Sequence, residues 1–152
     1  IVVVYMKTVA TNKRARFDYD ILETMEAGLA LSGAEVKSVK AGHVSLKGAY
    51  ATITQEGPVI LNMHVRHYEP AGTRVSDPTR TRGLLLHKRE VDYLRGKSQE
   101  QGLTIVPISV YIKGNLVKVQ LGLGRGKKKY DKRETIKKRD HKKEIARVIK
   151  RG

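Results

Sequence analysis

The chain has 152 residues, enough for one domain with a working hydrophobic core. Lysine and arginine outnumber aspartate and glutamate by 31 to 15, so the formal net charge is +16, which indicates a polyanionic partner such as nucleic acid or an anionic membrane surface. The absence of cysteine excludes disulfides and cysteine-based zinc sites and fits a cytoplasmic location. The apolar run Ile1–Val4 is far below the ~18–20 residues that a membrane span needs, so nucleic acid is the favoured partner and no membrane contact is expected.

The charge is unevenly distributed along the chain. Residues 125–152 contain 14 Lys or Arg and 4 Asp or Glu, a net charge of +10, which leaves +6 for residues 1–124. We therefore predict an N-terminal arm over residues 1–11, a mildly basic globular domain over 12–124 and a basic C-terminal tail over 125–152. A basic cluster, Lys13, Arg14 and Arg16, follows the arm.

The first predicted strand covers residues 17–31. Apolar residues occupy most odd positions from Phe17 to Leu31 and alternate with acidic and polar residues, the two-residue period of a half-buried strand. Leu22 and Glu23 break the alternation, which predicts a bulge or bend at that point.

A short helix is predicted over residues 32–42. Ser32 can cap its N-terminus, with Glu35 three residues later as the second member of a capping box. Gly42 supplies the left-handed residue at which such a helix stops. The local pattern therefore interprets Glu35 as a helix cap and leaves open whether it does anything else.

Alternation predicts four more strands, over residues 49–53, 59–65, 106–112 and 117–123. Within the second of these, Val59, Leu61, Met63 and Val65 are expected to share one face, opposite Ile60, Asn62 and His64. The last two strands are joined by Gly114-Asn115, a strong hairpin signal.

A polar loop, residues 66–82, and a helix separate the third strand from the fourth. Leu84, His87, Val91 and Leu94 recur at helical spacing, so His87 is expected to pack against the sheet. The order of elements predicts a mainly β fold with accessory helices, an OB-fold-like barrel of five strands, followed by the basic tail.

The sequence contains no convincing catalytic constellation. His64 and His67 have metal-ligand spacing, but residues three apart on a strand point to opposite faces. The segment "GLGRGKKK" lacks the spacing of a phosphate-binding loop and follows a terminal strand. Asp18 and Asp20 share a strand face, but no second acidic cluster accompanies them. We therefore expect no enzyme activity, no cofactor and no metal site.

A binding function remains. If the strand phases are right, four side chains project outward: Tyr50, Asn62, His64 and Lys118. An aromatic ring, an amide, an imidazole and a cation are groups that stack on bases and contact phosphates. Each could equally be an ordinary surface residue. Aromatic residues make up only 5% of the chain and tryptophan is absent, so folded RNA fits better than long single strands.

The segments "NKRAR", "DYDILETMEAGLALSGAEVKSVKAG", "LLLHKRE", "GLTIVPISVYIK" and "GRGKKKYDKRETIKKRD" closely resemble the SsrA-binding protein family, also called small protein B. The resemblance runs from Asn12 to Lys150. It implies an OB-fold protein that binds the tRNA-like domain of transfer-messenger RNA (tmRNA), and we expect a monomer. Together with elongation factor Tu, which carries the charged tmRNA, it would deliver that RNA to stalled 70S ribosomes for trans-translation, with rescue of the ribosome and tagging of the peptide.

The resemblance also implies two sets of site residues. Those facing tmRNA would be Arg14, Glu35, Tyr50, Asn62, His64, Leu85, Lys118 and Lys127. The tail would occupy the empty mRNA channel and reach the 16S rRNA decoding centre, folding as a helix when bound. Its residues there would be Lys128, Tyr130, Asp131, Lys132, Arg133, Lys137, Lys138, Val148 and Ile149.

One departure from the family pattern and two alternatives stay open. Phe17 stands where histidine is usual, which puts a polar RNA contact there in doubt. A ribosomal protein or a general OB-fold RNA chaperone would share the charge, the barrel and the tail. A membrane-surface binder is disfavoured, because Ile136 lies opposite the cluster of Ile145, Val148 and Ile149 on a helical projection. An isolated helix of the tail's length is marginal in water, so we expect the free tail to be disordered.

Overall fold

The computed structural model describes residues 5–68, 77–100 and 102–127, together with Arg133, Ile136, Lys137 and Arg139. The elements in chain order are β1 (Met6–Thr11), α1 (Ala15–Asp18), β2 (Tyr19–Leu29), α2 (Gly33–Lys40), β3 (Val44–Ser45), β4 (Tyr50–Thr54), β5 (Gly57–Leu61), β6 (His64–Val65), β7 (Arg82–Leu85), α3 (Lys88–Ser98), β8 (Leu103–Lys113) and β9 (Leu116–Gly126). Seven strands form one sheet in the order β1-β8-β9-β2-β7-β5-β4, and β3 pairs with β6.

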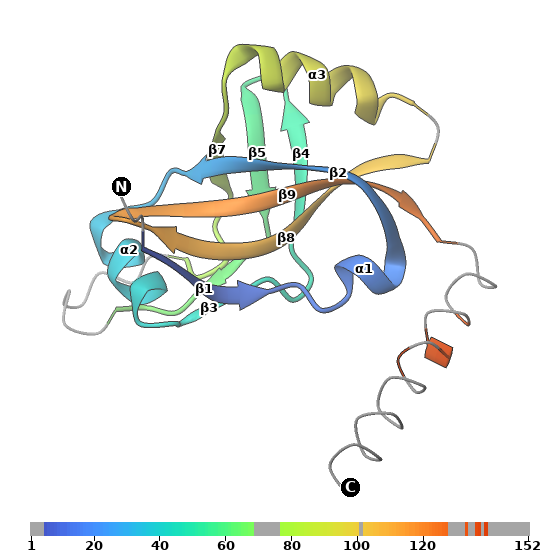
Figure 1. Ribbon diagram of the computed structural model, residues 1–152. Helices are drawn as coiled ribbons and strands as arrows, with labels where there is room; N and C mark the ends of the chain where they lie inside the picture. Colours follow the sequence, from blue (N-terminus) through green and yellow to red (C-terminus); the bar gives the residue numbers. More distant parts are fainter. Residues whose placement is uncertain are drawn as a thin grey trace, which may run out of the picture.

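The large sheet is antiparallel and folds back on itself. Strand β2 pairs with β9 from Tyr19 to Gly28, and its end at Gly28 and Leu29 pairs with β7. In Figure 1, β7, β5 and β4 run across the direction of β2, β9 and β8. Strand β4 comes back into contact with β8. The predicted mainly β, OB-fold-like architecture with accessory helices is confirmed.

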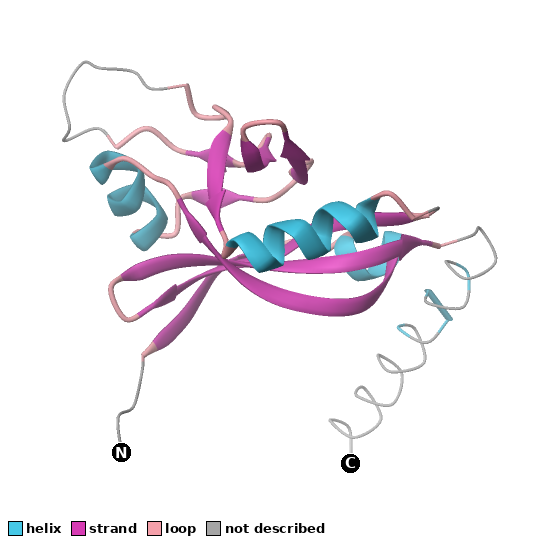
Figure 2. Ribbon diagram, turned by 90° about the horizontal axis from the view of Figure 1, so that it is seen from above, coloured by secondary structure: helices cyan, strands magenta, loops and turns pink. Residues whose placement is uncertain are grey.

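The hydrophobic core lies between the crossing parts of the sheet. Its largest fully buried apolar side chains come from both longer helices, from several strands and from the segments between them: Val39, Leu46, Ile60, Met63, Leu94, Val110, Val119 and Leu121. Helix α3 lies over the sheet in the view from above (Figure 2) and buries Leu94. The Tyr93 hydroxyl on the same helix donates to the Glu23 carboxylate of β2, 2.6 Å away. Burying such apolar side chains is the main source of the fold's stability.

Several features that the sequence predicts from neighbouring residues are present in the structure: a bulge, a capping box and two turns. The β2–β9 register shifts between Ile21 and Glu23, where the alternation breaks. The Ser32 hydroxyl accepts from the Glu35 backbone N–H while the Glu35 carboxylate accepts from the Ser32 N–H, which is the predicted capping box. Gly42 has a φ of 85°, and the β8–β9 hairpin turns at Gly114, with a φ of 61°.

The N-terminal region contains two elements that the sequence did not predict. Met6–Thr11, expected as part of an arm, form β1 and pair with β8 at the edge of the sheet. This strand is exposed on most of its length, so it lacks the apolar face that marks a strand in a sequence. Ala15–Asp18 form the one-turn helix α1, whose Ala15 is buried against Val106 and Ile108. At the other end of the domain, β9 continues to Gly126, two residues past residue 124, where the domain was predicted to end.

The predicted strand 59–65 is wrong in its phase. It is divided at Asn62, whose φ of 60° is left-handed, and its two halves belong to different sheets. Ile60 is fully buried, as are Met63 and Val65, so the inward positions change from even to odd numbers across the interruption. A left-handed residue breaks the pleat, and alternation cannot be carried through it.

The predicted helix around residues 84–94 begins later than its spacing suggested. Leu84 is a buried residue of β7, and α3 starts at Lys88. His87 precedes the helix, is exposed and does not pack against the sheet; its backbone N–H donates to the Glu90 carboxylate at 3.0 Å. Helical spacing across this strand–helix junction was therefore a coincidence.

Candidate nucleic-acid interface

Arg14 and Tyr50 lie in one groove, named here the Arg14 groove, between α1 and the start of β4. Asn12 connects the groove to β8, since its amide donates to the Pro107 carbonyl at 2.9 Å and its side-chain oxygen accepts from the Arg14 backbone N–H at 3.2 Å. The Arg14 guanidinium pairs with Asp18 at 3.3 Å, and Tyr50 is 49% exposed. Lys47 lines the same groove. Two cations beside an exposed aromatic ring suit a phosphate and a stacked base.

Phe17, the departure from the family pattern, lies beside this groove. Its ring is 4.7 Å from the Arg14 guanidinium and 5.2 Å from that of Arg139. Phenylalanine cannot supply the polar group that histidine would, but its ring face attracts cations. In this chain, the position therefore holds two arginines by cation–π contact.

Leu85 and Lys118 lie in a second groove, named here the Lys118 groove, and are placed there by strand pairing. Gly28 of β2 pairs with Leu85 of β7 on one side and with Lys118 of β9 on the other, so the three residues form a row across the sheet. A Cβ at Gly28 would lie 3.1 Å from the Leu85 Cβ, and Leu85 is 61% exposed. The glycine therefore leaves room for an apolar side chain that faces solvent beside a cation.

Glu26 and His87 also line the Lys118 groove, and no pattern in the sequence marks either as a site residue. The Tyr111 hydroxyl donates to the Glu26 carboxylate. This hydrogen bond lowers the pKa of Glu26, against the effect of burial, and the charges of Lys113 and Lys118 lower it further. Glu26 is thus an anion that offsets part of the Lys118 charge, and only the pairing of β2 with β9 could have revealed it.

Asn62 and His64 are both exposed, at the junction between β5 and β6. Tyr50 pairs with Leu61, which brings the Arg14 groove close to this junction along the sheet. Met63, between the two polar residues, is fully buried and holds the junction to the core. The outward projection predicted for Asn62, His64 and Tyr50 is therefore observed, although the strand phase on which part of it rested was wrong.

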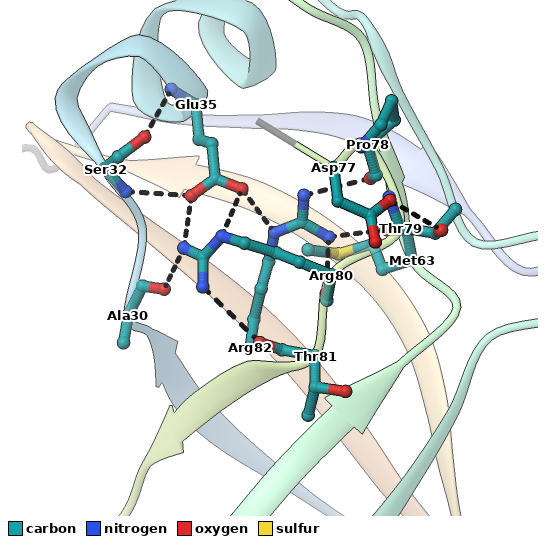
Figure 3. Close-up of polar contacts among 10 residues, drawn as sticks. All are labelled: Ala30, Ser32, Glu35, Met63, Asp77, Pro78, Thr79, Arg80, Thr81 and Arg82. Atoms are coloured by element: carbon teal, nitrogen blue, oxygen red, sulfur yellow. Dashed lines mark hydrogen bonds and ion pairs between the residues drawn. The ribbon is translucent and has the colours of Figure 1, made fainter. Parts of the chain in front are cut away.

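Glu35 differs from the other predicted RNA contacts, because it is only 3% exposed. Its carboxylate accepts from Arg80 and, at 2.6 Å, from Arg82 Nε, in addition to the Ser32 backbone N–H (Figure 3). Burial by itself would raise the pKa of Glu35, but hydrogen bonds from Arg80, Ser32 and Arg82 outweigh it and lower the pKa to about 2. We call Glu35, Arg80 and Arg82 the Glu35 cluster.

Lys127 is half-buried at the end of β9, where its backbone N–H donates to the Asp18 carbonyl at 2.8 Å. In the tail, Arg133 and Lys137 are helical and exposed. The remaining tail predictions lie outside the described residues: Lys128, Tyr130, Asp131, Lys132, Lys138, Val148 and Ile149. The structure thus places the body's candidate residues and leaves the assignments in the tail as predictions.

Two further observations concern the chemistry of the surface. Within residues 5–68, 77–100 and 102–127, no three His, Asp or Glu side chains come together as a metal site. No helix in this part of the chain is long and apolar enough to cross a membrane. His64 is exposed and His67 half-buried.

A family model described as "SmpB protein" matches residues 9–151. An SsrA-binding protein of Acaryochloris marina is 49% identical over 147 residues, which cover 96% of each chain. One from Leuconostoc mesenteroides is 50% identical over 141 residues, 93% of this chain and 92% of that protein. A solved structure described as "tmRNA-SmpB: a journey to the center of the bacterial ribosome" is 42% identical, with a TM-score of 0.65, and covers 88% of this chain and 94% of that one.

Proposed function

Because the chain belongs to the SsrA-binding protein family, we propose that it binds the tRNA-like domain of tmRNA and delivers this RNA to stalled ribosomes for trans-translation. The likeness to a tmRNA-SmpB structure supports both partners. In this proposal the protein acts by binding, with no catalytic step of its own, in the cytoplasm where ribosomes stall. Elongation factor Tu takes part through the charged tmRNA.

The observation that carries the proposal is the Lys118 groove. A cation and an exposed leucine lie in one row across the sheet, on a body whose residues 1–124 have a net charge of +6. Lysine contacts a phosphate, and the leucine side chain packs on a sugar or base face. The Arg14 groove adds a second contact with Arg14, Lys47 and Tyr50. Recognition through separate grooves suits a folded RNA better than a single strand.

The tail has a separate role in the proposal. Its charge of +10 within residues 125–152 suits the mRNA channel, which is lined by RNA. The family resemblance assigns Tyr130 to stacking in the decoding centre, and the motif Asp131-Lys132-Arg133 and the pair Val148-Ile149 to the same environment. The tail would then substitute for the missing mRNA while the body holds tmRNA.

Lys118→Ala should weaken binding of tmRNA roughly tenfold, because a charge-assisted contact to phosphate is lost. The thermal melt should change little, since Lys118 is only half-buried on β9 and forms no ion pair in the described residues. Filter binding or fluorescence anisotropy with tmRNA, and with bulk tRNA as competitor, measures the effect.

Lys97→Ala on the last turn of α3 is the matched control, because it removes the same charge away from both grooves. Its affinity for tmRNA should stay close to that of the wild type. Equal affinities of Lys118→Ala and wild type would contradict the assignment of the groove. A wild-type protein that does not distinguish tmRNA from bulk tRNA would instead favour a ribosomal protein or a general RNA chaperone.

A further inference from the structure

The Glu35 cluster contains two cations and one anion. Arg80 and Arg82 both pair with the Glu35 carboxylate. Arg82 directs its other N–H groups at backbone carbonyls: Met63 at 2.6 Å, Pro78 at 3.0 Å and Arg80 at 3.2 Å. Carbonyl oxygens satisfy hydrogen bonds but carry no net charge. The cluster as a whole therefore has a net charge of +1, formed around a guanidinium that is only 1% exposed.

Arg80 is the member of the cluster through which this charge reaches the surface. Its side chain is 38% exposed, against 4% for Glu35 and 1% for Arg82. Its guanidinium donates twice to Glu35 and once each to the carbonyls of Ala30 and Thr81, both at 3.4 Å (Figure 3). These contacts use four of its five N–H groups. Arg80 is thus a partly exposed arginine whose side chain the protein already holds in one orientation.

The backbone that carries Arg80 is also held by hydrogen bonds. The Arg80 backbone N–H donates to the Asp77 carbonyl at 3.2 Å, and the Asp77 carboxylate accepts from the Thr79 N–H at 3.0 Å and from its hydroxyl at 3.1 Å. The Pro78 carbonyl accepts from both Arg82 and the Val65 N–H, which connects this turn to β6. A positioned cation loses little conformational entropy when it binds, which favours affinity.

The cluster adjoins two of the predicted RNA contacts. The Met63 carbonyl, to which Arg82 donates, lies between Asn62 and His64 in the chain, and both of these are exposed. The Glu35–Arg82 pair therefore holds from the inside the segment that presents Asn62 and His64. A substitution of Glu35 would therefore alter the positions of Asn62 and His64 without any contact between the Glu35 carboxylate and RNA.

We propose that Arg80 is a further RNA-binding residue that contacts a phosphate of tmRNA, and that Glu35 is a positioning residue, acting through Arg80 and Arg82. This inference rests on the proposed function. It replaces the direct contact to RNA predicted for Glu35, whose carboxylate is buried and shared by two arginines. A phosphate is the ligand that suits a partly exposed arginine in a cluster with surplus positive charge.

The test is the salt dependence of tmRNA binding by the full chain and two single variants, Arg80→Ala and Glu35→Gln. Loss of one phosphate contact lowers the slope of log affinity against log salt concentration by about 1. Arg80→Ala should show this change and bind roughly tenfold more weakly. Arg89→Ala, an exposed arginine on α3, is the matched control and should change the slope and the affinity little. Unchanged slope and affinity in Arg80→Ala would overturn the proposal.

A double variant separates positioning from contact. If Glu35 acts through Arg80, Glu35→Gln as a single substitution should weaken tmRNA binding, and it should weaken binding much less when it is added to Arg80→Ala. If the two losses multiply, Glu35 contacts RNA itself and its positioning role is wrong. All measurements are made well below the melting temperatures of the variants, with folding checked by circular dichroism. A wild-type protein without preference for tmRNA over bulk tRNA would count against the proposed function, whereas a normal preference with an unaltered Arg80→Ala counts against this inference alone.

Discussion

Glu35→Gln should lower the free energy of unfolding by roughly 3 kcal/mol at neutral pH, because it removes the carboxylate that pairs with the buried Arg82. The lowering of the Glu35 pKa to about 2 expresses the same stabilisation through proton binding. Denaturant unfolding followed by circular dichroism measures it. Glu90→Gln is a close control, since Glu90 accepts from the His87 backbone N–H at the start of α3 as Glu35 does from Ser32 at the start of α2. Glu90 forms no ion pair with an arginine of the described residues, so the control should cost only about 0.5 kcal/mol.

The pH dependence of this difference follows from the direction of the pKa shift. A carboxylate whose pKa is lower in the folded state stabilises the fold above its unfolded pKa, 4.5, and loses that contribution as the pH falls toward the folded value of about 2. The gap between wild type and Glu35→Gln should therefore be largest above roughly pH 5 and shrink below it. A gap that stays constant down to pH 2, or a Glu35→Gln variant as stable as Glu90→Gln, would contradict the ion-pair account.

Truncation after Lys127 should abolish peptide tagging on stalled ribosomes while most of the affinity for isolated tmRNA remains. The structure sets this cut, because β9 continues to Gly126 and Lys127 still bonds to Asp18, so an earlier end would disturb the sheet. Both grooves lie in the part that is kept. Tagging in a reconstituted translation system with a truncated mRNA, and tmRNA binding by anisotropy, measure the two activities separately.

A scrambled tail is the control for charge alone. A chain whose residues 128–152 are reordered keeps the composition and the net charge but loses the motif Asp131-Lys132-Arg133 and the pair Val148-Ile149. It should bind tmRNA as the wild type does and fail to support tagging. Tagging at the wild-type rate by the truncated chain would refute the role of the tail as an mRNA substitute. If the scrambled chain supports tagging and the truncated chain does not, the tail acts through its charge and not through these motifs.

The Lys118 groove shows which of its residues strand alternation could predict and which it could not. Lys118 was expected on an outward face, because alternation along β9 depends only on its immediate neighbours. Its partners Leu85 and Glu26 could not be assigned to the same groove in this way, since the row across Gly28 exists only once β2 has paired with β7 and β9. Strand register is a property of the assembled sheet.

The β5–β6 junction and α3 show where pattern fails. Alternation placed Ile60 outside, and the left-handed backbone at Asn62 reverses that assignment. Helical spacing started the helix at Leu84, which β7 takes as a buried strand residue instead. In both cases a junction between elements lay inside a regular pattern of apolar residues, and periodicity does not detect such a junction.

Taken alone, the sequence was sufficient for the mainly β class, the division of charge between body and tail, the capping box at Ser32 and Glu35, and the resemblance to a tmRNA-binding family. Each of these depends on composition, on residues a few positions apart or on motifs that can be matched along the chain. Only the tertiary structure decided that Glu35 is buried between Arg80 and Arg82, which are 45 and 47 residues away. Whether a carboxylate faces solvent or an internal ion pair depends on the desolvation and the partners that folding brings to it, and neither can be seen in its sequence neighbours.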